Sequence, residues 1–343
     1  MFDLHGDALD SEEGDPHGLT LADYANLQPE LVIAAVEQTG RLSDARVLAL
    51  NSYENRVYQV GLEDADPVIV KFYRPRRWTT EQIREEHAFS WQLAEAELPV
   101  IAPLRDEQGE SLFNHAGFAY ALFPRKGGQA LEAGDFEQLL RIGHVLGRLH
   151  AIGSERPFEH RATLTWERWL DEPSAVVLAS RLLPSRWEAP YRQIILQLRQ
   201  QITESGLASA KTIRTQGDCH PGNIIWTRDQ GPWLLDFDDS QQAPAVQDLW
   251  MLLSGSEQEQ RLQLGELLEG YTTFHDFDMR EFALVEVLRT LRMIHYAGWL
   301  ANRWEDPAFP RYFPWFASDT YWQEHIQELQ MQSSRIEAKA WLS

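Results

Sequence analysis

Residues 217–223 read Gly-Asp-Cys-His-Pro-Gly-Asn, and residues 234–239 read Leu-Leu-Asp-Phe-Asp-Asp. Asp218 and Asn223 stand five positions apart, and Asp236 follows Asn223 by thirteen positions. The apolar residues before Asp236 are typical of a buried β-strand. A D-x-x-x-x-N spacing recurs by chance in many chains, and the proline and glycine inside it would also suit an ordinary turn. The neighbouring sequence therefore has to decide between a turn and a reactive loop.

The three polar side chains of these stretches suit phosphoryl transfer. In that reaction one carboxylate orients and deprotonates the acceptor hydroxyl, while an amide oxygen and a second carboxylate hold Mg²⁺ against the phosphates of ATP. Asp218, Asn223 and Asp236 fit these roles in chain order. Such oxygen ligands suit a hard cation rather than a thiophilic metal. We therefore expect a Mg-ATP-dependent kinase with Asp218 and Asp236 as catalytic residues and Asn223 and Asp236 as metal ligands.

Two further residues stand inside the loop. Metal binding by His220 is an alternative to loop-supporting hydrogen bonds, but no second histidine stands at ligand spacing nearby, so we expect the hydrogen bonds. Cys219, the single cysteine, directly follows the proposed base. A redox role would need an exposed thiol with a lowered pKa, which the sequence does not reveal, so this question stays open.

The chain before this loop predicts a small β-rich lobe. Antiparallel hairpin strands are predicted where β-branched and aromatic residues alternate with polar turns, at 45–50, 55–62, 67–73, 111–115 and 118–123. A short helix is expected at 29–38, and a second helix begins after a cap at Thr79 or Thr80. These elements form an α+β lobe at 21–124, followed by a hinge at 125–128 where paired glycines interrupt regular structure.

Within this lobe, Lys71 ends the apolar strand run Val-Ile-Val-Lys. Such a lysine can contact the α- and β-phosphates of ATP and form an ion pair with a glutamate of the following helix. We favour Glu86 as that glutamate, with Glu85 as the alternative, because helix phase cannot be fixed to one residue from sequence. The turn between the first two strands has no glycine, so Ser52 and Asn55 are the candidates for ATP contacts there.

The rest of the chain, at 129–343, predicts a larger helical lobe that carries the catalytic loop and the acceptor site. Helical periodicity covers 135–152, 187–204, 245–254, 257–274, 278–303 and 319–340, interrupted by a small β-hairpin around residues 224–237. Residues 1–20 are acidic and poor in apolar side chains, so we expect a disordered tail. The expected architecture is therefore a two-lobed, protein-kinase-like α+β fold.

Composition excludes several functional classes. The 343 residues are 43% apolar and 24% charged, as in an ordinary globular protein. A net charge of −21 disfavours nucleic acid and anionic membranes as partners, and no apolar run approaches the roughly 18 residues of a membrane helix. The acidic N-terminus does not resemble a signal peptide, and with one cysteine a disulfide framework is excluded, so we expect a cytoplasmic protein.

Taken together, the motifs resemble a known family. They are S-Y-E-N (52–55), V-I-V-K (68–71), E-E-H (85–87), G-D-C-H-P-G-N (217–223), L-L-D-F-D-D (234–239) and V-Q-D-L-W (246–250). The chain resembles the aminoglycoside phosphotransferase and choline kinase branch of protein-kinase-like enzymes over about residues 25 to 330, and within it the bacterial stress response kinase A group.

This resemblance implies an ATP-dependent Ser/Thr protein kinase of a bacterial stress response, with proteins, including itself, as acceptors. The alternative is a small-molecule hydroxyl kinase of the aminoglycoside, choline or homoserine type. The resemblance also implies that Asp248 braces the catalytic loop by accepting its backbone N–H groups. An exposed carboxylate at a helix start is the other interpretation of Asp248.

A candidate acceptor site lies on the helix predicted at 278–303. At 100° per residue, Arg289, Arg292 and Trp299 share one stripe of this helix. These side chains could line the acceptor site, or they could pack against the aromatic segment at 304–316. The net negative charge predicts attraction of cationic segments at long range. The sequence does not fix the oligomeric state, and a monomer is favoured.

Overall fold

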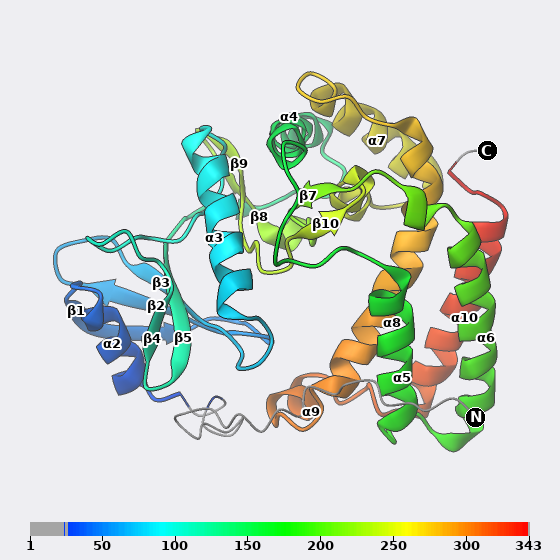
Figure 1. Ribbon diagram of the computed structural model, residues 1–343, viewed down its shortest axis with the longest axis horizontal. Helices are drawn as coiled ribbons and strands as arrows, with labels where there is room; N and C mark the ends of the chain where they lie inside the picture. The colour runs from blue at the N-terminus through cyan, green and yellow to red at the C-terminus, as the bar shows by residue number, and fades with distance from the viewer. Residues whose placement is uncertain (1–23, 25–26, 342–343) are drawn as a thin grey trace. The chain divides into compact units, whose positions relative to one another are not determined.

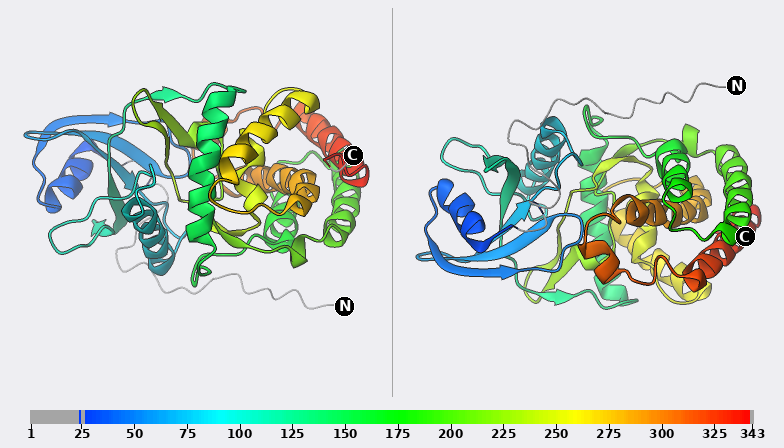
Figure 2. Two further views of the ribbon diagram at one scale, coloured as in Figure 1. Left: turned by 90° about the horizontal axis from the view of Figure 1, so that it is seen from above. Right: turned by 90° about the horizontal axis from the view of Figure 1, so that it is seen from below.

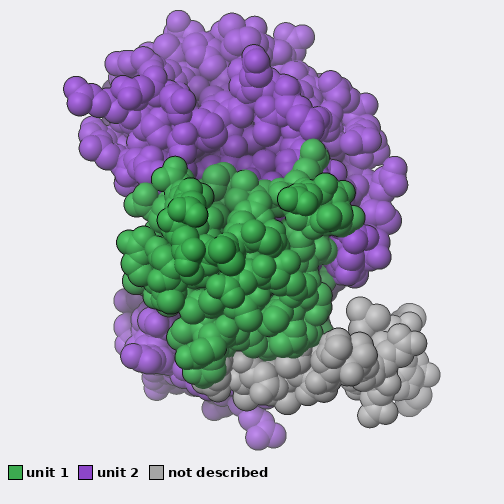
Figure 3. All heavy atoms as spheres, turned by 90° about the vertical axis from the view of Figure 1, so that its left-hand side faces the viewer, with its two compact units in different colours: residues 1–78, 104–125 green, residues 79–103, 126–343 purple. Residues whose placement is uncertain are grey.

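The computed structural model describes residue 24 and residues 27–341, so the tail predicted at 1–20 lies outside the described residues (Figure 1). The chain forms two compact units, coloured separately in Figure 3. Unit 1 takes the chain up to Trp78 together with Leu104–Arg125, and unit 2 takes Thr79–Pro103 together with the chain from Lys126 onward. The predicted pairing of a small β-rich part with a larger helical part is confirmed.

Unit 1 is an antiparallel sheet with one helix against it. It contains α2 (Pro29–Gln38), β1 (Ser43–Ala49), β2 (Arg56–Leu62), β3 (Val68–Phe72), β4 (Phe113–His115) and β5 (Phe118–Pro124), with strand order β1-β2-β3-β5-β4. The β4–β5 turn uses positive φ angles at Ala116 and Gly117, as the predicted hairpin requires. Alternate sheet residues such as Val70 and Phe72 pack against Val32 and Val36 of the helix.

Unit 2 is largely helical and carries two small sheets, β6-β8-β9 and β10-β7. Its elements are α3 (Thr80–Glu95), β6 (Gln129–Ala130), α4 (Phe136–Gly153), α5 (Glu172–Ala179), α6 (Ser185–Glu204), β7 (Ile213–Thr215), β8 (Ile224–Thr227), β9 (Gly231–Leu234), β10 (Gln241–Ala243), α7 (Glu257–Tyr271), α8 (Val285–Asn302), α9 (Ala308–Tyr312) and α10 (Asp319–Glu337). Helices α6 and α10 lie side by side at one end of this unit, as Figures 1 and 2 show.

Helices α4 and α7 pack closely because small residues stand where their backbones meet. A Cβ atom at Gly143 would overlap the carbonyl oxygen of Leu267, and one at Gly270 would overlap that of Leu140. This contact buries Leu146 and Leu149 of α4 in one core cluster with Leu267 and Tyr271 of α7. The last turn of α4 is thereby fixed in position inside unit 2.

The structure differs from the sequence prediction at 245–254, where we expected one helix. Two short 3₁₀ turns stand there instead, at Ala245–Asp248 and Trp250–Leu252. The side chains explain the difference, because Glu281 binds the backbone N–H of Val246 and the carboxylate of Asp248 is directed to other backbone groups. The helix predicted at 278–303 likewise begins as a 3₁₀ turn at Met279–Leu284.

Helix α3 is grouped with unit 2, although we had placed its residues in the lobe at 21–124. Phe89 and Leu93 of this helix are buried in a core cluster with Leu146 and Phe237 of unit 2. The helix begins at the predicted cap, where Thr79 and Gln82 form a capping box. Within the described residues, no helix is both long and apolar enough to cross a membrane.

Candidate active site

The candidate catalytic loop at 216–223 is held by its own polar groups. The backbone N–H of Asp218 donates to Gln216 Oε1 at 2.8 Å, and Asn223 Nδ2 donates to the carbonyl oxygen of Asp218 at 3.0 Å. Gly217 has a φ of +88°, and a Cβ atom there would overlap the carbonyl oxygen of Asp239. The loop therefore presents Asp218 and Asn223 in one defined conformation, with glycine required before the aspartate.

Asp248 holds the same loop from the 3₁₀ turn behind it. Its Oδ2 accepts from the backbone N–H of Gln216 at 2.7 Å, and its Oδ1 accepts from that of Gly217 at 2.8 Å. His150, at the end of α4, lies with Nε2 3.0 Å from Asp248 Oδ2 and with Nδ1 2.9 Å from the hydroxyl of Tyr271. All these side chains are fully buried, so their hydrogen bonds are made without competition from water.

Asp236 stands on the segment that follows β9, opposite the end of the catalytic loop. Pairing of Ile224 with Leu234 and a hydrogen bond of 3.1 Å from Leu235 N to Asn223 O bring the two segments together. Gln216 Nε2 donates to the carbonyl oxygens of Leu235 and Asp236 at 3.1 and 2.7 Å. Asp236 has a φ of +54° and an exposed side chain.

The carboxylate of Asp218 has two cationic or potentially cationic neighbours. Arg292 Nη1 donates to its Oδ1, and His220 Nε2 lies 3.3 Å from its Oδ2. Burial by itself raises the pKa of Asp218, but the hydrogen bond from His220 and the charge of Arg292 outweigh burial, so this pKa lies below its ordinary value. Asp218 is therefore ionised at neutral pH, as a general base has to be.

The donor set around Asn223 and Asp236 fits a magnesium ion. The Asn223 amide uses its N–H on the backbone of Asp218, which leaves its oxygen as a ligand, and Asp236 offers an exposed carboxylate. Mg²⁺ commonly uses only one or two protein ligands and takes the rest from phosphates and water. Within the described residues, no group of three His, Cys, Asp or Glu side chains forms a self-contained metal site.

Helix α3 separates the roles of Glu85 and Glu86. Glu85 accepts from the backbone N–H groups of residues 159–161 at 2.6–2.8 Å and is thereby occupied within unit 2. Glu86 is buried, and its Oε2 lies 3.8 Å from Arg161 Nη1. Arg161 also donates to the carbonyl oxygens of Asp238 and Ser240, so it ties α3 to the segment after Asp236.

The remaining nucleotide candidates lie in unit 1. Lys71 is buried on β3, with Nζ 4.8 Å from the ring centroid of Tyr73. Because Lys71 and Glu86 belong to different units, their ion pair stays a prediction. Ser52 Oγ accepts from the backbone N–H of Val57 at 3.2 Å and so orders the β1–β2 turn. Asn55 is buried, and its Oδ1 accepts from the backbone N–H of Arg74, which gives it a structural contact within this unit.

The stripe of α8 proposed for the acceptor divides into two surroundings. Arg289 and Arg292 line a cavity of about 470 Å³, which we call the arginine pocket and which is also lined by His220, Trp250, Ser254 and Gln260. Trp299 does not line it. The Trp299 ring instead stacks on Tyr296 and meets Phe309 and Phe313 edge-on, with ring centroids 4.9 and 5.9 Å away. The packing alternative thus describes Trp299, and the arginines lie beside the catalytic loop.

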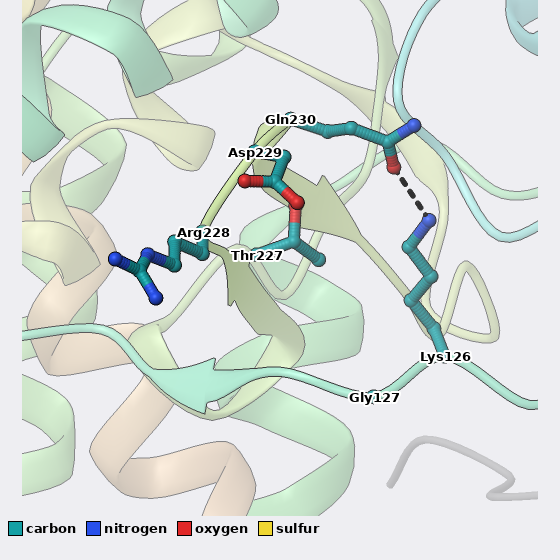
Figure 4. A pocket seen from close by; sticks show the side chains of 6 residues that line it. All are labelled: Lys126, Gly127, Thr227, Arg228, Asp229 and Gln230. Atoms are coloured by element: carbon teal, nitrogen blue, oxygen red, sulfur yellow. Dashed lines mark hydrogen bonds between the residues drawn. The ribbon is translucent and has the colours of Figure 1, made fainter.

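A second cavity, of about 420 Å³, lies beside the β8–β9 turn (Figure 4). It is lined by Lys126, Gly127, Thr227, Arg228, Asp229 and Gln230, and Lys126 Nζ donates to Gln230 Oε1 at 2.8 Å. Lys126 and Gly127 belong to the predicted hinge. The sequence-predicted site residues do not line this cavity.

Cys219 is buried in the core beneath the loop, with a side chain that is 1% exposed. Burial and the nearby carboxylates of Asp248 and Asp218 raise the pKa of the Cys219 thiol well above its ordinary value. Both properties disfavour a reactive thiolate.

Sequence reasoning missed the residues that support the loop from behind. His150, Gln216, Arg161 and Gln247 all hold the backbone or carboxylates of the loop segments, and Gln247 Nε2 donates to Gly217 O at 2.8 Å. For His150 a signal existed, because it is a polar residue on the buried face of an amphipathic helix. Arg161 lies in an irregular segment, where the sequence offers no comparable signal.

Comparison with protein families gives one match, in which residues 21–285 match the phosphotransferase enzyme family. The serine/threonine protein kinase RdoA of Salmonella typhimurium strain LT2 is 44% identical over 300 residues, which cover 88% of this chain and 90% of that protein. The stress response kinase A of Escherichia coli K12 is 44% identical over 299 residues, covering 87% and 90%.

Solved structures with a similar fold are more distant in sequence. Amicoumacin kinase hAmiN in complex with AMP-PNP, Ca²⁺ and Ami has a TM-score of 0.67 at 17% identity, covering 89% of this chain and 93% of that one. Spectinomycin phosphotransferase APH(9)-Ia in complex with ADP and spectinomycin has a TM-score of 0.63 at 13% identity, covering 91% and 99%. These similarities establish the kinase-like fold.

Proposed function

The chain belongs to the phosphotransferase enzyme family, and from that premise we propose that it is a Mg-ATP-dependent kinase that phosphorylates Ser or Thr hydroxyls of proteins. The observation that carries the proposal is one hydrogen-bonded loop that holds Asp218 and Asn223 and is bridged by Gln216 to Asp236. The Ser/Thr specificity and the link to a bacterial stress response are supported by the names of relatives at 44% identity.

Asp218 acts on the acceptor hydroxyl. Its carboxylate accepts the hydroxyl proton while the hydroxyl oxygen forms a bond to the γ-phosphorus of ATP. The bond from that phosphorus to the oxygen bridging it to the β-phosphate breaks, and ADP leaves with the electron pair. The lowered pKa of Asp218 keeps the carboxylate ionised before the acceptor arrives.

Asn223 and Asp236 would hold Mg²⁺, which when bound neutralises the negative charge of the phosphates. Gln216 and Asp248 keep these ligands and the base in fixed positions through backbone hydrogen bonds, so little reorganisation accompanies the reaction. Lys71 and Glu86 are proposed to form the ion pair that positions the α- and β-phosphates, with Ser52 as a further ATP contact.

The test is phosphate transfer from γ-labelled ATP to protein. We expect the purified chain to label itself or proteins of a bacterial extract, with the label recovered as phosphoserine or phosphothreonine after acid hydrolysis. Asp218→Asn should remove this labelling, whereas Asp276→Asn, a change of the same type at an exposed loop position, should keep it. Label confined to metabolites would favour the small-molecule alternative and contradict a protein acceptor.

A further inference from the structure

The arginine pocket opens directly beside the proposed base. Two of its lining residues, His220 and Arg292, are the residues that contact the carboxylate of Asp218. A group bound in this cavity of about 470 Å³ would therefore share Arg292 and His220 with the carboxylate of Asp218. The ionisable side chains that line the pocket are His220, Arg289 and Arg292, and no carboxylate lines it. This is unusual in a chain with a net charge of −21.

One arginine of the pocket, Arg289, is held in place by a buried carboxylate. Glu286 is 2% exposed and accepts from Arg289 at 2.9 Å, from Arg335 at 2.9 Å and from the indole N–H of Trp341 at 2.8 Å. Together with the Arg292–Asp218 pair, this network contains three guanidinium groups and two carboxylates. Arg289 and Arg335 share the single carboxylate of Glu286, and of these two arginines Arg289 lines the pocket.

The contact of Arg292 with Asp218 competes with the acceptor hydroxyl for the carboxylate that is proposed to act as the base. An acceptor hydroxyl must reach an oxygen of Asp218, yet Arg292 occupies Oδ1 and His220 stands next to Oδ2. A guanidinium that leaves Oδ1 can pair with another anion, which offsets the cost of giving up its carboxylate partner at a side-chain exposure of 36%. The planar guanidinium of Arg292 would match a carboxylate or phosphate, which it binds through two parallel hydrogen bonds.

We propose that the arginine pocket binds an anionic group of the acceptor and that Arg292 moves from Asp218 to this group when the acceptor binds. The inference rests on the proposed function and adds the chemical class of the acceptor: a Ser or Thr with an acidic or phosphorylated residue close in sequence. Because an extended chain spans about 3.3–3.6 Å per residue, that residue lies within about two positions of the hydroxyl.

The negative net charge of the chain does not prevent an anionic acceptor group from binding in the arginine pocket. Interactions between exposed charges are screened over about 10 Å at 0.1 M salt, so the overall field governs approach rather than contacts inside the pocket. Within the pocket, Arg292 and Arg289 are the nearest charged side chains to a bound group. The exchange also makes the base available only when a suitable acceptor is present, which would limit transfer of phosphate to water.

A positional peptide library with fixed Ser or Thr tests the inference. The probes carry Glu, phosphothreonine, Gln or Lys at each flanking position, and kcat/KM is measured for every member. We expect Glu or phosphothreonine to be preferred over Gln by about 10-fold at one position within two residues of the acceptor. The comparison of Glu with phosphothreonine identifies which anion the pocket takes. No preference, or a preference for Lys, would overturn the inference while leaving the protein-kinase function intact.

Variants assign the preference to Arg292. Arg292→Gln should lose the preference for the anionic residue, and Arg292→Lys should retain part of it, because lysine keeps the charge without the planar fork. Arg192→Gln is the matched control, since Arg192 is an exposed helical arginine with a glutamate partner four residues before it, away from the pocket. A preference that survives in Arg292→Gln would contradict the assignment, and circular dichroism with thermal melting verifies that each variant is folded.

A second pair of acceptors separates this inference from the proposed function. Glycerate and glycerol differ in one carboxylate, and both offer hydroxyl groups. Phosphorylation of glycerate but not of glycerol, without any peptide labelling, would reject the protein acceptor and with it the Ser or Thr peptide class, and would support only the binding of an anionic acceptor group. A preparation that hydrolyses ATP but phosphorylates neither peptides nor glycerate would overturn both.

Discussion

In the proposed catalytic loop, backbone groups hold the candidate catalytic residues, whereas in the arginine pocket side chains hold one another. Asp248 and Gln216 fix the loop through five hydrogen bonds to its backbone and to that of the segment at Asp236. In the pocket, Arg292 and Arg289 are paired with carboxylates, and such pairs can exchange partners without a change of fold. We infer from this difference that the backbone of the fold positions the residues proposed for phosphoryl transfer. Acceptor selection, by contrast, is proposed to depend on side-chain ion pairs that can exchange partners.

The largest effect should follow from removal of Asp236, the proposed metal ligand that follows the loop. Asp236→Ala should abolish the tightening of ATP binding by Mg²⁺, because Asn223 alone offers an incomplete oxygen set. Titration calorimetry with and without Mg²⁺ measures this difference. Asp276→Ala serves as the control, and an unchanged Mg²⁺ dependence in Asp236→Ala would refute the role of Asp236.

A smaller effect on turnover, together with a loss of stability, is expected from Asp248→Asn. The amide cannot accept from all three donors that Asp248 now serves, so one buried N–H is left unsatisfied at a cost of about 1–3 kcal/mol in the free energy of unfolding. Displacement of the loop should lower turnover by roughly 10- to 100-fold. Urea unfolding and steady-state kinetics on the same preparation test both parts; wild-type values in both would show that the loop does not need this brace.

The pH profile of kcat/KM tests the contact between Arg292 of the pocket and Asp218. The charge of Arg292 contributes to the lowered pKa of Asp218, so Arg292→Gln should raise that pKa. Because kcat/KM requires the ionised base, its acid limb should move to higher pH, and activity should be lost earlier on acidification. Arg192→Gln should keep the wild-type profile. An acid limb that stays in place or moves to lower pH in Arg292→Gln would disprove the contact as a determinant of the base.

The smallest effect on acceptor choice is expected from Trp299→Leu. Trp299 packs in the aromatic cluster with Tyr296 and Phe309 and does not line the arginine pocket. The change should lower the melting temperature through lost packing but alter the peptide preference by less than about twofold. A preference changed as strongly as in Arg292→Gln would mean that the acceptor site extends along the helix to this residue.

These results also mark which features were readable from sequence. The spacing of Asp218, Asn223 and Asp236 predicts a constellation that the fold assembles, because consecutive residues and one short hairpin form it. Helical periodicity predicted that Arg289, Arg292 and Trp299 share one stripe of α8, but it did not predict which residues surround each of them. Seven residues separate Arg292 from Trp299, about 10 Å along a helix, so residues of one stripe meet different neighbours.

Long-range packing explains features that the sequence left open. Helix phase did not separate Glu85 from Glu86, and in the structure the segment at 159–161 occupies Glu85, while the ion pair of Lys71 with Glu86 stays a prediction. His150 of α4 reaches Asp248 of the 3₁₀ turn although the two residues stand 98 positions apart in sequence. Contacts of this kind depend on tertiary structure, which the periodicity and spacing of residues in the sequence do not reveal.

The central claim is that Asp218 carries out the proton transfer of a phosphoryl-transfer reaction. A rapid-quench single-turnover experiment with labelled Mg-ATP and the best acceptor measures that step directly, and equilibrium titration measures the Kd for ATP in parallel. We predict that Asp218→Asn lowers the single-turnover rate by roughly 10² or more with a nearly unchanged Kd. A single-turnover rate close to that of the wild type would contradict the assignment of Asp218 as the base.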